Sequence, residues 1–331
     1  MQPKYKRILL LSLKIVVSTF LCYFLIKKIG LGNFARQFQT AKISWIIVGL
    51  AVFLVSNLLG SLQWYLLMRH SQISITFNKA LQYYFIGLFF NNFFVSNMGG
   101  DVFRIYYASK YSRNGTGAIS SVFLDRFFGF SVLTMMALAS ALFWLQSVYA
   151  KTILPVTAAI LGFWILLTAF FLNRHLAQGV QWILQIFLPQ NIVQKFREIY
   201  VLIRNLRHQK FLVSVVFGTS VLIQFLRVFT HYIAGRSLGI DVGLQVFFVF
   251  IPLIALLATL PVSVGGLGVR EQTGVILFSK LGVVSGKAAS MEFIAYLIAI
   301  FSSLPGVIFF LLTKHNRHKY LDQKESNEDK T

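Results

Sequence analysis

Residues 261–271 read PVSVGGLGVRE, a proline- and glycine-rich turn that ends in an arginine and a glutamate. This turn directly follows a continuous apolar run, VFFVFIPLIALLATL at residues 246–260. A second stretch of the same character, VSNMGGDVFR, occupies residues 95–104 and also follows an apolar run. The fold must therefore place two flexible, charged turns directly beside segments that avoid water.

The composition assigns the chain to the polytopic α-helical membrane proteins. Of its 331 residues, 56% are hydrophobic and only 12% are charged, whereas soluble domains carry about 25% charged residues. A helix needs about 20 apolar residues to cross a bilayer. The apolar runs are continuous, unlike the alternating pattern of a membrane β-barrel. Candidate segments are residues 8–26, 43–68, 80–98, 118–149, 152–172, 211–233, 244–262 and 288–313.

The net charge of +21 comes from basic residues that flank the apolar segments. Such a distribution controls membrane topology and favours anionic lipid headgroups, so we expect no nucleic-acid partner. The one cysteine, Cys22, lies inside the first apolar run. It excludes an intramolecular disulfide and a cysteine metal site, and we expect neither a metal nor a cofactor.

The two glycine turns belong to a longer internal repeat. In each, an arginine follows the second glycine by four positions, Arg104 after Gly100 and Arg270 after Gly266. Another arginine precedes the second glycine in each copy, Arg69 by 31 residues and Arg236 by 30. An acid lies in the next apolar segment of each copy, Asp125 in the first and Glu292 in the second. Two copies offset by half the chain are typical of transporters. The predicted repeat halves are about 43–149 and 211–313, although two short motifs can also match by chance.

The distribution of basic residues predicts how the segments cross. The N-terminus, the 173–210 linker and the C-terminus are basic and should all be cytoplasmic. All three regions are cytoplasmic if residues 80–113 and residues 244–282 each enter and leave the membrane on the same side. The predicted fold is thus six spanning helices plus two re-entrant helical hairpins in an inverted repeat. The predicted residues of the two re-entrant turns are Gly99, Gly100, Pro261, Gly265, Gly266 and Gly268. This topology places four basic residues on the outer side of the membrane, against the positive-inside rule: Lys27, Lys28, Arg36 and Lys42.

The linker 173–210 contains an amphipathic helix. Its apolar face comprises Ile192, Phe196, Ile199, Ile203 and Leu206, with basic residues opposite. This helix lies flat on the cytoplasmic leaflet or packs on the bundle. Residues 1–313 form one transmembrane domain, and residues 314–331 are predicted to be a disordered cytoplasmic tail.

The scarcity of acids identifies a candidate site. The chain has ten acidic residues, four of them after residue 320. An ionised group inside a membrane helix costs about 2.5–3.5 kcal/mol, so such groups pair or line a polar path. The predicted central site comprises Asp101, Arg104, Asp125, Arg126, Arg270, Glu271 and Glu292, and Arg227 either joins it or reaches the surface. Ion pairs that only hold the hairpins in place are the alternative.

Arginines beside a glycine turn suit a phosphate, which accepts bidentate hydrogen bonds. Helix ends at the turns would offer further N–H groups to an anion. The hypothesis is a cavity that admits lipid headgroups while the acyl tails stay in the bilayer. No catalytic motif is present, and His231 is expected to be a hydrogen-bonded packing residue.

Three stretches carry a family resemblance: NNFFVSNMGGDVFRIYYASK (91–110), AISSVFLDRFFGF (118–130) and LPVSVGGLGVREQTGVILFSKLGV (260–283). They resemble the flippase-like family, also called the lysylphosphatidylglycerol synthase transmembrane region. In bifunctional members this region precedes a soluble aminoacyl-transferase domain and moves the aminoacylated lipid across the membrane. The motif residues map to Gly99, Gly100, Asp101 and Arg104; to Asp125–Arg126, often Glu-Arg in the family; and to Pro261, Gly265, Gly266, Gly268, Arg270 and Glu271.

With no room for a transferase domain after residue 313, we expect a stand-alone member. The resemblance implies lipid translocation but does not name the lipid. We expect an anionic, aminoacylated or polyprenyl-linked lipid, a location in the cell inner membrane and, from the basic residues, both termini in the cytoplasm. Alternatives are a partner of a separately encoded lipid synthase, a membrane-embedded glycosyltransferase, and an ion-coupled transporter with Asp101 or Glu292 as proton carrier.

Overall fold

The structure is a computed structural model, and every element that it describes is helical. It describes residues 39–93, 99–143, 150–173, 185, 188–259 and 266–313. Several sequence predictions lie outside these residues: the first span at 8–26 with Cys22, the tail at 314–331, and the turn residues Pro261 and Gly265.

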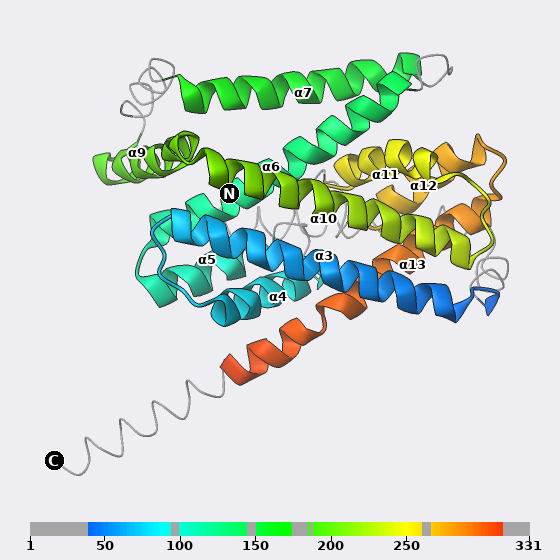
Figure 1. Ribbon diagram of the computed structural model, residues 1–331, viewed down its shortest axis with the longest axis horizontal. Helices are drawn as coiled ribbons and strands as arrows, with labels where there is room; N and C mark the ends of the chain where they lie inside the picture. Colours follow the sequence, from blue (N-terminus) through cyan, green and yellow to red (C-terminus); the bar gives the residue numbers. More distant parts are fainter. Residues whose placement is uncertain are drawn as a thin grey trace, which may run out of the picture.

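Two long antiparallel helices form the centre of the fold. Helix α3 (Ile43–His70) and helix α10 (Lys210–Ser237) lie side by side along the long axis in Figure 1 and make the most extensive contact between any two described helices. The backbone N–H of Lys42, just before α3, donates to the carbonyl of Ser237 at the end of α10, at 2.9 Å. The first helix of one predicted repeat half thus runs opposite to the first helix of the other.

Each long helix is followed by a pair of short ones. Helix α4 (Phe77–Phe93) packs on α5 (Gly99–Ser112), and α11 (Leu244–Ala258) packs on α12 (Val269–Ser279). The two pairs lie toward opposite ends of α3 and α10 (Figure 1). The four helices have 17, 14, 15 and 11 residues, fewer than the roughly 20 of a typical span. Their turning within the membrane remains a prediction.

A further long helix closes each half: α6 (Gly115–Phe143) in the first and α13 (Ser285–Ser303) in the second. In the first half α3 contacts α4 and α6, and α5 contacts both α4 and α6. In the second half α10 contacts α11 and α13, and α12 contacts both α11 and α13. Across the halves, α6 contacts α10 and α11, while α13 contacts α3 and α4. Both halves therefore have the same pattern of helix contacts.

Four helices are long and apolar enough to cross a membrane: Ile43–His70, Gly115–Ala139, Lys210–Ser237 and Ser285–Thr313. They correspond to four of the six predicted spans. Helix α7 (Ala150–Leu172), of 23 residues, coincides with a fifth. The protein is an all-helical membrane protein with several apolar helices.

Helix α9 (Gln190–Asn205) continues into a short 3₁₀ turn, Leu206–His208. Val193, Ile203 and Leu206 are buried, and α9 packs against α6 and α7. Ile192 and Phe196, from the predicted apolar face, are 39% and 50% exposed. The C-terminal part of that face packs on the bundle, while contact of the exposed part with the leaflet remains a prediction.

The glycines of the two turns are needed for different physical reasons. Gly266 and Gly268 have φ of +78° and +83°, in the left-handed region that favours glycine. Gly100 instead allows α5 to approach α4, because a Cβ there would collide with the carbonyl group of Gly87. The prediction that glycine supplies conformational freedom at both turns thus fits Gly266 and Gly268, whereas Gly100 is required for space.

We expect Gly100→Ala to lower the stability of the fold, because the backbone of Gly87 cannot move aside as a side chain could. Overpacking of this kind costs about 1–3 kcal/mol. Thermal unfolding in detergent measures the effect. Gly162→Ala on α7 is the matched control, since nothing lies within 4 Å of its added Cβ. Equal unfolding midpoints for the two variants would contradict the close approach.

Candidate functional site

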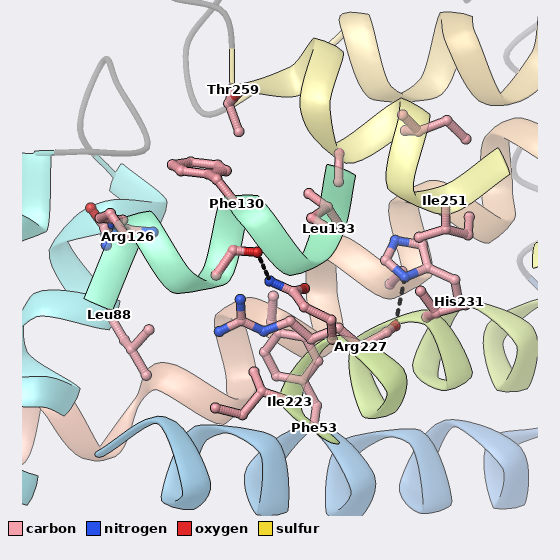
Figure 2. A pocket seen from close by; sticks show the side chains of 18 of the residues that line it. Phe53, Leu88, Arg126, Phe130, Leu133, Ile223, Arg227, His231, Ile251 and Thr259 are labelled. Carbon is pink, nitrogen blue, oxygen red and sulfur yellow. Dashed lines mark hydrogen bonds between the residues drawn. The ribbon is translucent and has the colours of Figure 1, made fainter. Parts of the chain in front are cut away.

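A cavity of about 270 Å³ lies where the two halves meet. Its lining comes from α3, α4, α5 and α6 of the first half and from α10, α11, α12 and α13 of the second. Figure 2 shows Arg126 on α6 and Arg227 on α10 among apolar side chains such as Phe130, Leu133 and Ile223. The charged residues that line the cavity are Arg104, Asp125, Arg126, Arg227 and Arg270.

Two arginines of the cavity are held by two aspartates. Arg104 donates to Asp125 at 2.8 Å and to Asp101, three residues earlier on α5, at 3.2 Å. Arg126 donates to the two carboxylate oxygens of Asp101 at 2.7 and 3.0 Å. Asp101 and Arg104 are only 7% and 2% exposed. These four side chains form a paired cluster that joins α5 to α6, in which Asp101 and Arg104 are buried and Arg126 is partly exposed.

Arg104 is fixed by its surroundings as well as by its ion pairs. Its guanidinium lies 4.4 Å from the ring centroid of Trp64 and 4.8 Å from that of Tyr84, a cation–π arrangement. Gly87 leaves room for its aliphatic stem, because a Cβ at that position would lie 2.5 Å from Cγ of Arg104. The arginine therefore forms a rigid part of the cavity wall.

A glutamine that the sequence analysis did not select extends this cluster to α10. The side-chain amide of Gln63 on α3 donates to Asp125 at 3.0 Å. Its oxygen accepts hydrogen bonds from Thr219 at 3.0 Å and from Ser220 at 2.8 Å. The signal that could have identified Gln63 is an amide side chain inside an otherwise apolar span.

Arg227 and Arg270 differ from the other two cavity arginines. Within the described part of the chain, neither has an acid at ion-pair distance. Nε of Arg227 is buried and has no hydrogen-bond partner there. The guanidinium of Arg270 lies 5.6 Å from the ring centroid of Tyr296 on α13. Their positive charges are thus available to an anion in the cavity.

Glu271 does not line the cavity, contrary to the predicted site. It is 4% exposed, and its carboxylate accepts the backbone N–H of Gly268 at 2.7 Å, where α12 begins. At the start of α5, the N–H of Gly100 donates to Asn91 at 2.7 Å. The expectation that the helix ends offer unpaired N–H groups is therefore wrong for the backbone amides of Gly268 and Gly100. The arginine side chains remain as hydrogen-bond donors to an anion.

Glu292 also lies behind the cavity wall, with 0% exposure, against Gly274 of α12. Its carboxylate is 3.5 Å from Nε2 of His231, which does line the cavity. Nδ1 of His231 lies 3.0 Å from the carbonyl oxygen of Arg227 (Figure 2). His231 is hydrogen-bonded as predicted, but its contact with Glu292 was not foreseen.

The contact between Glu292 and His231 differs from the one that the internal repeat predicts. Asp125 in the first half pairs with Arg104, so the equivalent partner of Glu292 would be Arg270. Glu292 faces His231 instead, and Arg270 is left toward the cavity. Among the described residues, no group of three or more His, Cys, Asp or Glu side chains could hold a metal ion.

A family model described as the lysylphosphatidylglycerol synthase transmembrane region matches residues 11–306. The chain belongs to this family. The matched range contains both glycine turns and every residue of the candidate site, so this arrangement lies within the membrane region that defines the family.

Two relatives of this chain are UPF0104 membrane proteins. A UPF0104 membrane protein of Pyrococcus horikoshii is 23% identical over 328 residues, covering 92% of this chain and 97% of its own. A UPF0104 membrane protein of Methanothermobacter thermautotrophicus is 22% identical over 307 residues, covering 87% of this chain and 90% of its own.

Proposed function

We propose that this protein moves a lipid with an anionic phosphate headgroup across the cell inner membrane through the cavity. The observation that carries the proposal is the pair of cavity arginines, Arg227 and Arg270, which have no acid at ion-pair distance among the described residues. Buried charges are costly unless they are compensated. A phosphate compensates them well, because its oxygens match the donor geometry of guanidinium groups.

The size of the cavity supports a headgroup as the occupant. Its volume of about 270 Å³ is just below the roughly 300–1,000 Å³ of ordinary ligand pockets. A phosphoglycerol group fits such a space, whereas two acyl chains do not and would stay in the bilayer. Both halves contribute to the lining, as in transporters whose halves rock around a central site.

The chemistry common to the candidate lipids is a phosphate, found in phosphatidylglycerol, its aminoacylated forms and polyprenyl phosphates. A polyprenyl chain leaves the contacts between the phosphate and Arg227 and Arg270 unchanged, whereas lysylation adds positive charge that these two arginines repel. The proposal therefore names the phosphate as the recognised group, and transport of each lipid class distinguishes among them.

Translocation in vesicles tests the proposal. Purified protein is reconstituted with phosphatidylglycerol, lysylphosphatidylglycerol or phosphatidylcholine that carries a fluorophore on an acyl chain, and a membrane-impermeant reductant bleaches the outer leaflet. We expect protein-dependent loss of the protected inner fluorescence for phosphatidylglycerol, at least tenfold faster than in protein-free vesicles. A rate equal to that of protein-free vesicles for all three lipids would contradict the proposed function.

A further inference from the structure

Arg270 is held in the cavity in a different way from Arg104. Arg104 is fixed by two aspartates and two aromatic rings. Arg270 has no acid at ion-pair distance in the described chain. Its neighbour Glu271 interacts with it electrostatically, but the carboxylate of Glu271 accepts the N–H of Gly268 at 2.7 Å. What holds the guanidinium of Arg270 among the described residues is the ring of Tyr296, whose centroid lies 5.6 Å away.

The ring of Tyr296 is itself fixed by a contact between the two halves. Tyr296 lies on α13, and its hydroxyl donates to the carbonyl oxygen of Asn92 on α4 at 3.2 Å. The side-chain amide of Asn92 donates back toward α13, to Oγ of Ser303 at 2.9 Å. Both Tyr296 and Asn92 line the cavity. The ring is therefore held in one orientation at the cavity wall.

The helices behind this contact pack closely. A Cβ on Gly306, just after α13, would collide with the carbonyl group of Phe85 on α4. The rings of Phe85 and Phe309 lie 6.3 Å apart in an edge-to-face arrangement. Close packing of backbone and rings leaves α4 little freedom to move relative to α13. Tyr296 thus has a rigid support on both helices that it touches.

The ring belongs to one half of the repeat. Tyr296 follows Glu292 by four positions, whereas the residue four positions after Asp125 is Gly129, which has no side chain. The half that contains the ring is also the half whose repeated arginine has no acid at ion-pair distance. The ring therefore compensates for a difference between the halves and is not part of their common framework.

A ring suits an arginine that has to bind an anion. An arginine that lies over an aromatic ring can still donate from the edge of its guanidinium plane, where a phosphate accepts two hydrogen bonds. An aspartate would occupy those same donors. An unsupported arginine side chain loses rotamer freedom when it binds, and that loss lowers the affinity. A ring that already holds the guanidinium reduces this cost and leaves the N–H groups free for the phosphate.

We infer that Tyr296 is a positioning residue, which holds Arg270 over its ring in the orientation that receives the phosphate of an anionic headgroup. The inference rests on the proposed function, because the phosphate is that of the transported lipid. It adds the residue that sets the strength of phosphate binding at one of the two cavity arginines.

Binding of a soluble anionic lipid tests the inference. The probe is dihexanoyl phosphatidylglycerol, titrated into purified protein in detergent and followed by calorimetry. Tyr296→Leu removes the ring and should raise the Kd by about three- to tenfold. Tyr296→Phe keeps the ring and should bind within about twofold of the wild type. Tyr296→Met is a second variant without a ring, whose flexible side chain fills the space better, and it should weaken binding as Tyr296→Leu does.

A double-mutant cycle with Arg270→Gln separates positioning from a general effect on the cavity. Once Arg270 is replaced, loss of the ring should change the Kd by less than about twofold, since the ring acts through this arginine. The matched control is Tyr232→Leu. Tyr232 lies 6.0 Å from the guanidinium of Arg236, and neither residue lines the cavity. Its replacement should leave the Kd unchanged, and thermal unfolding verifies that each variant is folded.

The possible results separate the inference from the proposed function. Folded Tyr296→Leu and Tyr296→Met proteins with the wild-type Kd would overturn the positioning role and leave the proposed function standing. Equal weakening by Tyr296→Leu with and without Arg270 would assign the effect to the cavity as a whole and also overturn the inference. A wild-type protein that does not bind the lipid would count against the proposed function, and the role of Tyr296 would fall with it.

Discussion

Arg104→Ala is expected to destabilise the protein more than replacement of any other cavity arginine. Arg104 is 2% exposed and bonds to both Asp101 and Asp125. Its removal leaves two largely buried carboxylates to share the charge of Arg126. Breaking a buried ion pair from one side costs about 3–5 kcal/mol. The loss of contact with the rings of Trp64 and Tyr84 adds to this cost.

The thermal unfolding midpoint and the monodisperse fraction in detergent measure this effect. Arg236→Ala is the control, because Arg236 forms an exposed ion pair with Asp241 at 2.8 Å, and such pairs contribute about 0–1 kcal/mol. A double variant, Arg104→Met with Asp125→Asn, should recover part of the stability, since one uncompensated carboxylate is removed. A midpoint for Arg104→Ala equal to that of the wild type would show that the cluster contributes little.

The site could be predicted in part because buried charges are expensive. Few acids occur outside the tail, so each one within an apolar segment stood out in the sequence. Five of the predicted residues line the cavity: Arg104, Asp125, Arg126, Arg227 and Arg270. The sequence left open whether Arg227 joins the site or reaches the surface, and the structure places it in the cavity wall.

The remaining members could not be placed from spacing alone. The spacing of residues in the sequence assigns a side chain to a helix. It does not determine whether the charged group of that side chain faces the cavity or lies behind the cavity wall. Glu271 does not line the cavity, and its carboxylate instead accepts the N–H of Gly268 at the N-terminus of its own helix. Glu292 would pair with Arg270 if the halves were alike, but its carboxylate lies 3.5 Å from Nε2 of His231 instead.

The long helices followed directly from the apolar runs, because a run of that length has no other stable form in a bilayer. The contacts between helices did not. Gly100 illustrates this limit: a glycine beside a turn reads as a flexible position, yet its space is filled by the backbone of α4. The packing of Ile203 and Leu206 of the basic linker on the bundle likewise depends on tertiary contacts that periodicity does not contain.

The combined replacement Arg227→Gln and Arg270→Gln is expected to leave stability nearly unchanged and to reduce translocation strongly. Neither arginine has an acid at ion-pair distance in the described chain, so no ion pair is broken, and Glu271, with which Arg270 interacts electrostatically, keeps its hydrogen bond from the N–H of Gly268. A hydrogen bond to a charged group contributes about 1.5–3 kcal/mol, and about 1.4 kcal/mol corresponds to a factor of ten. At the lower end of this range each single variant should therefore lose roughly tenfold in rate, and the double variant roughly a hundredfold.

The rate of phosphatidylglycerol translocation in proteoliposomes is the most direct test of the central claim that Arg227 and Arg270 carry the headgroup through the cavity. Wild-type protein, the double variant and Arg236→Gln are reconstituted at equal density. Arg236 lies on the same helix as Arg227 but outside the cavity lining, so its variant should match the wild type. The account predicts a folded double variant that translocates about a hundredfold more slowly. A folded double variant with the wild-type rate would show that the lipid follows another path.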